Sequence, residues 1–235
     1  STVCTPHYNS FTKEPPMASF IKISRDEAVV KENKGGGSYL SKSGIYPVTI
    51  KFASVSVNEH NARSIDFNLD YNGNSSTLYG LKLDNNDGSE NYMYPIFNNL
   101  AIIAGLDDIN EPEEQDHAVG KDNEIKSFMV LDDFTGLEVL VRVQQEYSKY
   151  NNEIKARLTI KGFYRAEDKA NAFEIIKGEG FGTQHGKDLA YAEKITYKDG
   201  LTAEEVSTWE AQKSGKPGAV KPASQTPVKS NAFRR

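Results

Sequence analysis

The chain has 235 residues with 33 acidic and 28 basic side chains, which gives a formal net charge of −5. This length supports one good-sized domain with extensions or at most two small domains, and no apolar run reaches the ~18–20 residues that a membrane-spanning helix needs. The only cysteine, Cys4, excludes an intramolecular disulfide and a cysteine-based zinc cluster, so we expect a reducing cytoplasm and no membrane partner.

The charge is unevenly distributed along the chain. Residues 84–124 contain eleven acids and one base, whereas residues 213–235 contain six bases and no acid. The negative total argues against a nucleic-acid partner. Because the two signs are separated, however, the average says little about any one surface.

The first 16 residues show no hydrophobic periodicity and precede Met17, where Met-Ala-Ser is typical of a native start. We therefore expect residues 1–16 to be a leader or a segment added for expression. The Gly- and Lys-containing residues 31–44 predict a mobile loop before the first strand.

The first strand is expected over residues 46–57. Its apolar positions alternate and then change phase, which predicts a β-bulge near Ala53 and Ser54. The apolar positions are Val48, Ile50, Phe52, Val55 and Val57.

The second strand is expected over residues 63–71 and the third over residues 75–83. Asn72-Gly73 between them is a strong signal for a two-residue hairpin turn. That turn places Leu78 opposite Phe67 on the inner face and Tyr79 opposite Asp66 on the outer face. The remaining inward residues of the second strand are Ile65 and Leu69.

One helix follows the third strand. Apolar residues recur at helical spacing over residues 93–104, and Gly105 is a suitable stop. Residues 106–125 then predict an acidic loop, and residues 128–131 predict a short apolar strand.

Residues 137–164 predict a long hairpin with the turn at Asn151-Asn152. Counting back from the turn pairs apolar with apolar residues and polar with polar ones, and a slip of one residue would destroy this agreement. The apolar pairs are Tyr147 with Ala156, Val143 with Ile160 and Val141 with Gly162. The polar pairs are Glu146 with Arg157, Gln144 with Thr159 and Arg142 with Lys161, and Leu140 meets Phe163 beyond them.

Three strands, a helix and further strands form the element order of an OB-fold, a five-stranded Greek-key barrel with one helix between strands 3 and 4. The alternative is a β-sandwich, which more often has seven short strands and no helix in the middle. We assign residues 17–165 to this mainly β core and residues 166–213 to a C-terminal extension. The extension contains residues 172–178, a short strand or helix, and a helix over residues 202–213 with a capping box at Thr202 and Glu205. Residues 214–235 predict a disordered basic tail.

Catalytic motifs are scarce. The sequence has no phosphate-binding loop and no HExxH. The stretch GEGFG at residues 178–182 has the wrong spacing for a dinucleotide site, and DNNDGSE at residues 84–90 has the wrong spacing for an EF-hand. The four histidines are far apart. Two acidic pairs, Asp107-Asp108 and Asp132-Asp133, leave open a metal-dependent nuclease, but we favour turns as their explanation. We expect no enzyme, cofactor or metal site.

A binding surface is the remaining candidate. Single-stranded nucleic acid is held by cations that contact phosphates and by aromatic side chains that stack on bases. The outer face of the long hairpin and the outward side chains of strands one and three supply both types. The opposing Glu146 would neutralise Arg157 if the two pair. The candidate residues are Lys51, Tyr79, Lys82, Arg142, Tyr147, Tyr150, Lys155, Arg157, Lys161 and Phe163.

The layout of residues 19–165 resembles the phage-encoded OB-fold single-stranded DNA-binding proteins. The resemblance rests on a Gly-rich lead into GIYPVTIKFASV, on the helix YPIFNNLAIIAGLDD and on the basic terminal hairpin. It implies a protein that coats single-stranded DNA during replication, recombination or repair in the cytoplasm of an infected bacterium, and that does no chemistry. The alternative interpretation is a β-sandwich structural or protein-interaction module of a phage.

The chain departs from this family at its end. Many such proteins have an acidic tail closed by an aromatic residue that recruits other enzymes, whereas this chain ends in Asn-Ala-Phe-Arg-Arg. Contacts with replication or recombination proteins of phage or host are therefore expected through the basic tail or through the acidic residues 106–125. The sequence does not define the oligomeric state.

Overall fold

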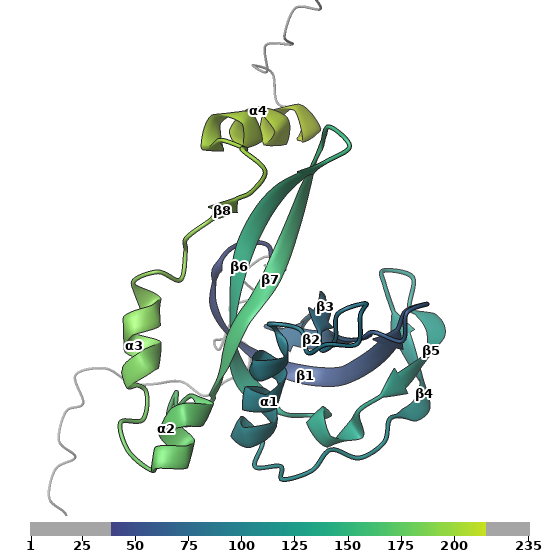
Figure 1. Ribbon diagram of the computed structural model, residues 1–235, viewed down its shortest axis with the longest axis vertical. Coiled ribbons are helices and arrows are strands. Elements are labelled where there is room, and N and C mark those ends of the chain that lie inside the picture. Colours follow the sequence, from purple (N-terminus) through teal and green to yellow (C-terminus); the bar gives the residue numbers. More distant parts are fainter. Residues whose placement is uncertain (1–38, 215–235) are drawn as a thin grey trace, which may run out of the picture. The chain divides into compact units, whose positions relative to one another are not determined.

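The computed structural model describes residues 39–214 (Figure 1), so the predicted leader, most of the Gly- and Lys-containing loop and nearly all of the basic tail lie outside the described residues. The strands of the first part are β1 (Gly44–Val57), β2 (Arg63–Tyr71), β3 (Asn74–Lys82), β4 (Glu113–Val119) and β5 (Glu124–Val130), with α1 (Tyr94–Ile103) between β3 and β4. A 3₁₀ turn, η1 (Asp132–Phe134), leads to β6 (Glu138–Tyr150) and β7 (Glu153–Arg165). The extension contains α2 (Ala172–Lys177), α3 (Thr183–Leu189), β8 (Thr196–Tyr197) and α4 (Ala203–Lys213).

The fold is mainly β, as predicted, and its helix follows the third strand. The strands form one sheet of eight with the hydrogen-bonded order β3-β2-β1-β5-β4; β6 pairs with the first half of β1, with β7 and, in parallel, with β8. Across residues 39–214 no ladder joins β3 to β7. The sheet is therefore open and larger than the predicted five strands.

The bulge in β1 lies earlier than predicted. The pairing with β2 shifts between Ile50 and Phe52, so Lys51 is the extra residue. After this shift Ala53 is the residue that shares the core with Val48 and Ile50. Phe52 is buried away from that core, where its ring stacks on His117 of β4 with 3.9 Å between the ring centroids.

The β2–β3 hairpin is confirmed from its turn as far as the pair of Phe67 with Leu78. Beyond that pair the register shifts, so the predicted pair of Tyr79 with Asp66 is wrong. Tyr71 pairs with Asn74 across the two-residue turn, and Phe67 pairs with Leu78 in the core. Asn72 and Gly73 both have positive φ, 52° and 77°, which is the backbone geometry that this turn requires.

The predicted acidic loop is wrong over most of its length, because residues 113–130 form the β4–β5 hairpin. In β4 the exposed acids Glu114 and Asp116 alternate with half-buried residues such as His117, which lies opposite Lys126. β5 joins the sheet by pairing Ser54 with Val130. The many acids obscured a period of two that would have indicated a strand.

The register of the β6–β7 hairpin is confirmed from the turn as far as Val143, which pairs with Ile160. A bulge then shifts the pairing by one residue, so that Arg142 lies opposite Gly162 and Val141 opposite Phe163. The predicted outward position of Phe163 is therefore wrong. A shift of one residue sends a side chain to the other face of a strand.

The extension has more helix than the sequence predicts. Residues 172–177 are helical, with a capping box formed by Asn171 and Glu174, and α3 is an additional helix. α4 begins at Thr202 with the predicted capping box to Glu205. Within residues 39–214, no helix combines the length and apolar character needed to cross a membrane.

Candidate nucleic-acid interface

A groove of about 540 Å³ lies between the outward face of β1–β3 and the tip of the β4–β5 hairpin. Its cations are Lys51, Lys121 and Lys126, and its acids are Asp66 and Glu124, so the lining has one excess positive charge. Its aromatic residues are Tyr39, Phe52, Tyr79 and Phe128, and its uncharged polar residues include Asn68, Ser75 and Thr77. We call this site the β1–β5 groove.

Two of the ten predicted residues, Lys51 and Tyr79, line the β1–β5 groove. Tyr79 is 66 % exposed on β3, in the outward orientation that the hairpin register predicts. The Lys51 ammonium donates a hydrogen bond to Ser75 Oγ at 3.1 Å, which directs the cation across β2 to β3. An exposed ring and a cation in the same groove offer the two contacts that a single strand needs.

An aromatic cluster lines the groove where the β4–β5 hairpin meets β1. The ring of Phe52 lies 3.9 Å from that of His117 and 5.1 Å from that of Phe128, measured between centroids. His117 Nε2 also lies 3.2 Å from Gln115 Oε1. The two ring contacts of Phe52 hold the β4–β5 hairpin against β1.

The sequence analysis missed Lys121, Lys126 and Phe128. They belong to the segment that the sequence predicts to be a loop or a short apolar strand. Lys126 makes an ion pair with Glu124 at 3.0 Å on the same strand. The alternation of residues 114–119 is the signal that could have indicated this hairpin.

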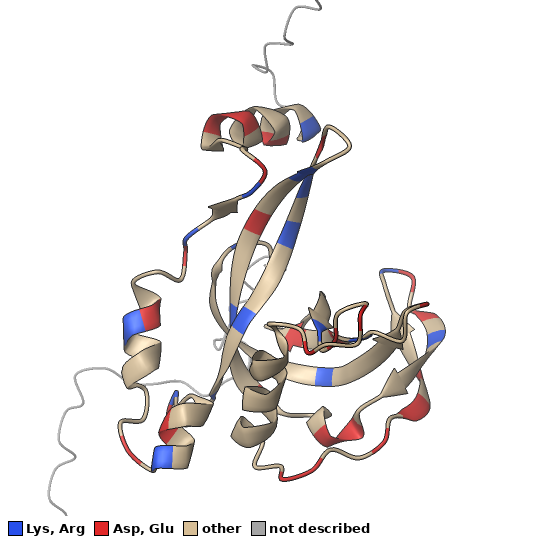
Figure 2. Ribbon diagram, in the orientation of Figure 1, with Lys and Arg blue, Asp and Glu red and all other residues tan. Residues whose placement is uncertain are grey.

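Figure 2 shows Lys and Arg as blue bands along the β6–β7 hairpin, but the contacts of the predicted cations do not leave them as an open basic face. Lys155 pairs with Glu153, and Arg142 pairs with Asp188 of α3 at 3.0 Å. Lys161 pairs with Glu146 at 2.7 Å. Each of these three cations therefore has a carboxylate beside it, and a phosphate would have to compete with that carboxylate.

Arg157 does not pair with Glu146, although the two face each other across the hairpin. Its guanidinium instead donates to the main-chain carbonyls of Tyr79 and Gly80 on β3, at 2.8 and 3.0 Å. Lys82 is exposed at the end of β3 and does not line the groove.

Two predicted stacking residues are buried. Phe163 is 3 % exposed and its ring centroid lies 5.6 Å from that of Phe67 in the core. Tyr147 is 6 % exposed, stacks on Tyr197 of β8 and donates its hydroxyl hydrogen to Glu210 of α4. Burial and the hydrogen bond to Glu210 raise the pKa of Tyr147. Neither ring is available to a base.

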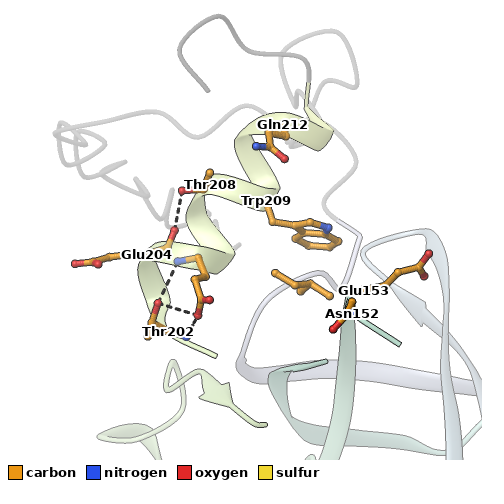
Figure 3. A pocket seen from close by; sticks show the side chains of 9 residues that line it. Asn152, Glu153, Thr202, Glu204, Thr208, Trp209 and Gln212 are labelled. Atoms are coloured by element: carbon orange, nitrogen blue, oxygen red, sulfur yellow. Dashed lines mark hydrogen bonds between the residues drawn. The ribbon is translucent and has the colours of Figure 1, made fainter. Parts of the chain in front are cut away.

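Tyr150 is 68 % exposed at the tip of the β6–β7 hairpin, beside a second hollow of about 720 Å³ between this tip and α4. Figure 3 shows Trp209 of α4 facing the hairpin turn across this hollow. Its charged lining residues are all acids, Glu153, Glu204 and Glu205. Carboxylates repel phosphates, so this hollow is unsuited to nucleic acid.

The buried carboxylate of Glu146 joins the extension to the hairpin. It accepts hydrogen bonds from Lys161 at 2.7 Å and from Lys198, which follows β8, at 2.6 Å. Burial alone would raise the pKa of Glu146, but the two ammonium groups outweigh it and lower the pKa from 4.5 to about 2.

This pKa predicts a loss of stability in acid. Because the folded state binds the proton less tightly, the stabilisation by Glu146 is complete above its unfolded pKa of 4.5 and is lost as the pH falls towards about 2. We expect Glu146→Gln to lower the free energy of unfolding by about 1–3 kcal/mol at neutral pH, and by much less near pH 2. Urea unfolding at several pH values measures both. Glu204→Gln, at an exposed position, is the control, and identical pH profiles for wild type and Glu146→Gln would contradict the assignment.

The carboxylates of Asp132 and Asp133 are hydrogen-bonded to neighbouring amide groups. Asp133 accepts hydrogen bonds from the main chain and side chain of Asn110 at 2.8 and 2.7 Å, and Asp132 accepts one from Gln115 at 3.4 Å. Across residues 39–214, no three His, Cys, Asp or Glu side chains are grouped so that they could hold a metal ion.

Comparison of the chain with protein-family models gives no matching family, and comparison with curated proteins gives no matching relative.

Proposed function

We propose that this protein binds single-stranded DNA, without strong sequence preference, in the β1–β5 groove. The observation that carries the proposal is that an exposed aromatic ring, Tyr79, and three lysines line the same groove. Lysines supply attraction to any phosphate backbone, and an aromatic ring stacks on any base. Neither contact depends on the nucleotide sequence of the DNA.

The arrangement of the strands supports an OB-type core. β1, β2, β3, α1, β6 and β7 follow the OB-fold order, and the β4–β5 hairpin is an insertion between α1 and β6. Arg157 links β7 to β3 where a closed barrel would have a ladder. OB-folds bind oligonucleotides on the outer face of strands 2 and 3, and Tyr79 lies on that face.

The resemblance to phage proteins supplies the cellular role within this proposal. The protein would protect single strands during replication, recombination or repair in an infected bacterial cell, as a binding protein with no catalytic step. The groove has few cations, so we expect moderate affinity per molecule.

The proposal is tested by fluorescence titration with oligothymidylate and with duplex DNA of the same length, at two salt concentrations. We expect tighter binding to the single strand and a steep fall in affinity with salt. Equal binding to duplex, or no binding at low salt, would sink the proposal.

The groove lysines should set the salt dependence. We expect Lys51→Ala combined with Lys126→Ala to lower the slope of log affinity against log salt by about 1.4, because each phosphate that a lysine neutralises contributes about 0.7 to this slope. Lys155→Ala is the matched control, because Lys155 lies outside the groove and already pairs with Glu153. An unchanged slope in the double variant would place the phosphates elsewhere.

Exposed apolar side chains in the extension favour a second role in protein interaction. They lie in or next to α2 and α3 and comprise Phe173, Ile176, Phe181, Leu189 and Tyr191. Soluble proteins rarely expose large apolar patches without a partner. Two measurements distinguish this protein-interaction role from DNA binding. A structural module would form a stable oligomer in light scattering, and it would show no salt-dependent affinity for oligonucleotides in titrations.

A further inference from the structure

The peptide group between Tyr79 and Gly80 is held on both sides by ionised side chains. Asp66 of β2 accepts a hydrogen bond from the Gly80 N–H at 2.6 Å. Arg157 Nη2 of β7 donates to the Tyr79 carbonyl at 2.8 Å and to the Gly80 carbonyl at 3.0 Å. Hydrogen bonds to charged groups are stronger than neutral ones. We call this arrangement of Asp66, Arg157 and the Tyr79–Gly80 peptide the peptide clamp.

The backbone at Gly80 is adapted to the clamp. Gly80 has a φ of +65°, and a Cβ at this position would lie 2.9 Å from Arg157 Nη2. Any other residue would therefore strain the main chain and displace the guanidinium. The β2–β3 register also shifts at this level, between Ile65 and Phe67. The shift in the β2–β3 register and the charged contacts of the peptide clamp thus occur at the same place.

Arg157 can contact β3 because the carboxylate that lies opposite it, Glu146, already pairs with two lysines. Glu146 lies opposite Arg157 but is bound by Lys161 and Lys198. β3 is the first strand in the hydrogen-bonded order, so Arg157 provides the link to β7 that a ladder would otherwise provide.

We infer that Arg157 is a positioning residue for Tyr79. By fixing the peptide that follows Tyr79, it holds the ring outward over the β1–β5 groove before a ligand arrives. A ring that is already ordered loses less entropy when a base stacks on it. The inference rests on the proposed function, and it gives Arg157 a role different from that of the phosphate-neutralising Lys51 and Lys126.

The test is a double-mutant cycle measured by titration with oligothymidylate at several salt concentrations. The variants are Arg157→Gln, Arg157→Lys, Tyr79→Ala and the combination of Arg157→Gln with Tyr79→Ala. We expect Arg157→Gln to weaken binding about fivefold, the cost of ordering a side chain on binding, with an unchanged salt slope. In the Tyr79→Ala background it should have no further effect, since the two residues act as one unit. Arg157→Lys keeps the charge but lacks the planar fork, so it should restore affinity only in part.

Two outcomes of the cycle would overturn the inference. A salt slope lowered by about 0.7 in Arg157→Gln would make Arg157 a phosphate ligand. An equal reduction in affinity with and without Tyr79 would show that Arg157 acts independently of that ring.

A measurement on the free protein separates this inference from the proposed function. Hydrogen exchange at the Gly80 amide should be faster in Arg157→Gln than in wild type, with unchanged exchange at the β6–β7 turn as the control for folding. If Arg157→Gln does not fold, the comparison is made with Arg157→Lys. Unchanged exchange at Gly80 would overturn the inference. If the wild-type protein binds no oligothymidylate, the proposed function is contradicted. The rate of hydrogen exchange at the Gly80 amide would still decide whether Arg157 holds β3.

Discussion

Replacing Tyr79 with alanine is expected to weaken binding to oligothymidylate by about 5- to 150-fold, because one base–aromatic stack contributes about 1–3 kcal/mol. Tyr79 is exposed and lines the groove, so the change removes a stacking surface for the ligand without opening a cavity in the core. The salt slope should stay the same, because no cation is removed. Fluorescence titration at two salt concentrations measures both quantities.

Tyr150→Ala is the matched control for Tyr79→Ala. The two rings are similarly exposed, at 68 % and 66 %, but Tyr150 lies at the tip of the β6–β7 hairpin and not in the groove. We expect no change in affinity from Tyr150→Ala. If Tyr150→Ala weakens binding as much as Tyr79→Ala does, the ligand follows the hairpin and the β1–β5 groove is not the site.

Replacing Phe163 with alanine is expected to lower the free energy of unfolding by about 3–5 kcal/mol, the range for large-to-small changes of buried aromatic residues. Phe163 is 3 % exposed and packs against Phe67. Urea denaturation followed by circular dichroism measures the change.

Phe163→Leu separates stability from binding. It retains most of the buried volume, so it should fold and bind oligothymidylate as wild type does. A folded Phe163→Leu variant with markedly weaker binding would revive the interpretation of this ring as a stacking platform.

Local signals in the sequence are sufficient to predict strand pairing where the turn itself sets the register. Asn72-Gly73 places Leu78 in the core and Tyr79 outside, and Asn151-Asn152 sets the first eight pairs of the long hairpin. The prediction is wrong after the bulge at Lys161, since an extra residue in one strand depends on packing against distant segments. That single residue moves Phe163 from the surface to the core.

The candidate site could be predicted only in part, for a related reason. Lys51 and Tyr79 belong to strands whose facing can be counted from local patterns. Lys121, Lys126 and Phe128 join them only because β5 pairs with β1, a contact between segments about seventy-five residues apart, Ser54 with Val130. The sequence overestimates the hairpin cations because it does not show which carboxylates pair with them. Glu153 and Glu146 lie on the hairpin itself, and Asp188 lies in an extension whose docking no local pattern indicates.

The acidic residues of β4 have an effect that is separate from ligand binding, because this strand lies at the edge of the sheet. β4 is the last strand of the hydrogen-bonded order, so the described fold leaves its outer main-chain groups without a strand beside them. Such an edge is a template on which another copy can add a strand and start aggregation, and charged side chains oppose this. Glu113, Glu114 and Asp116 place three like charges along that edge. The acids of β4 therefore oppose edge-to-edge pairing between two copies of this sheet.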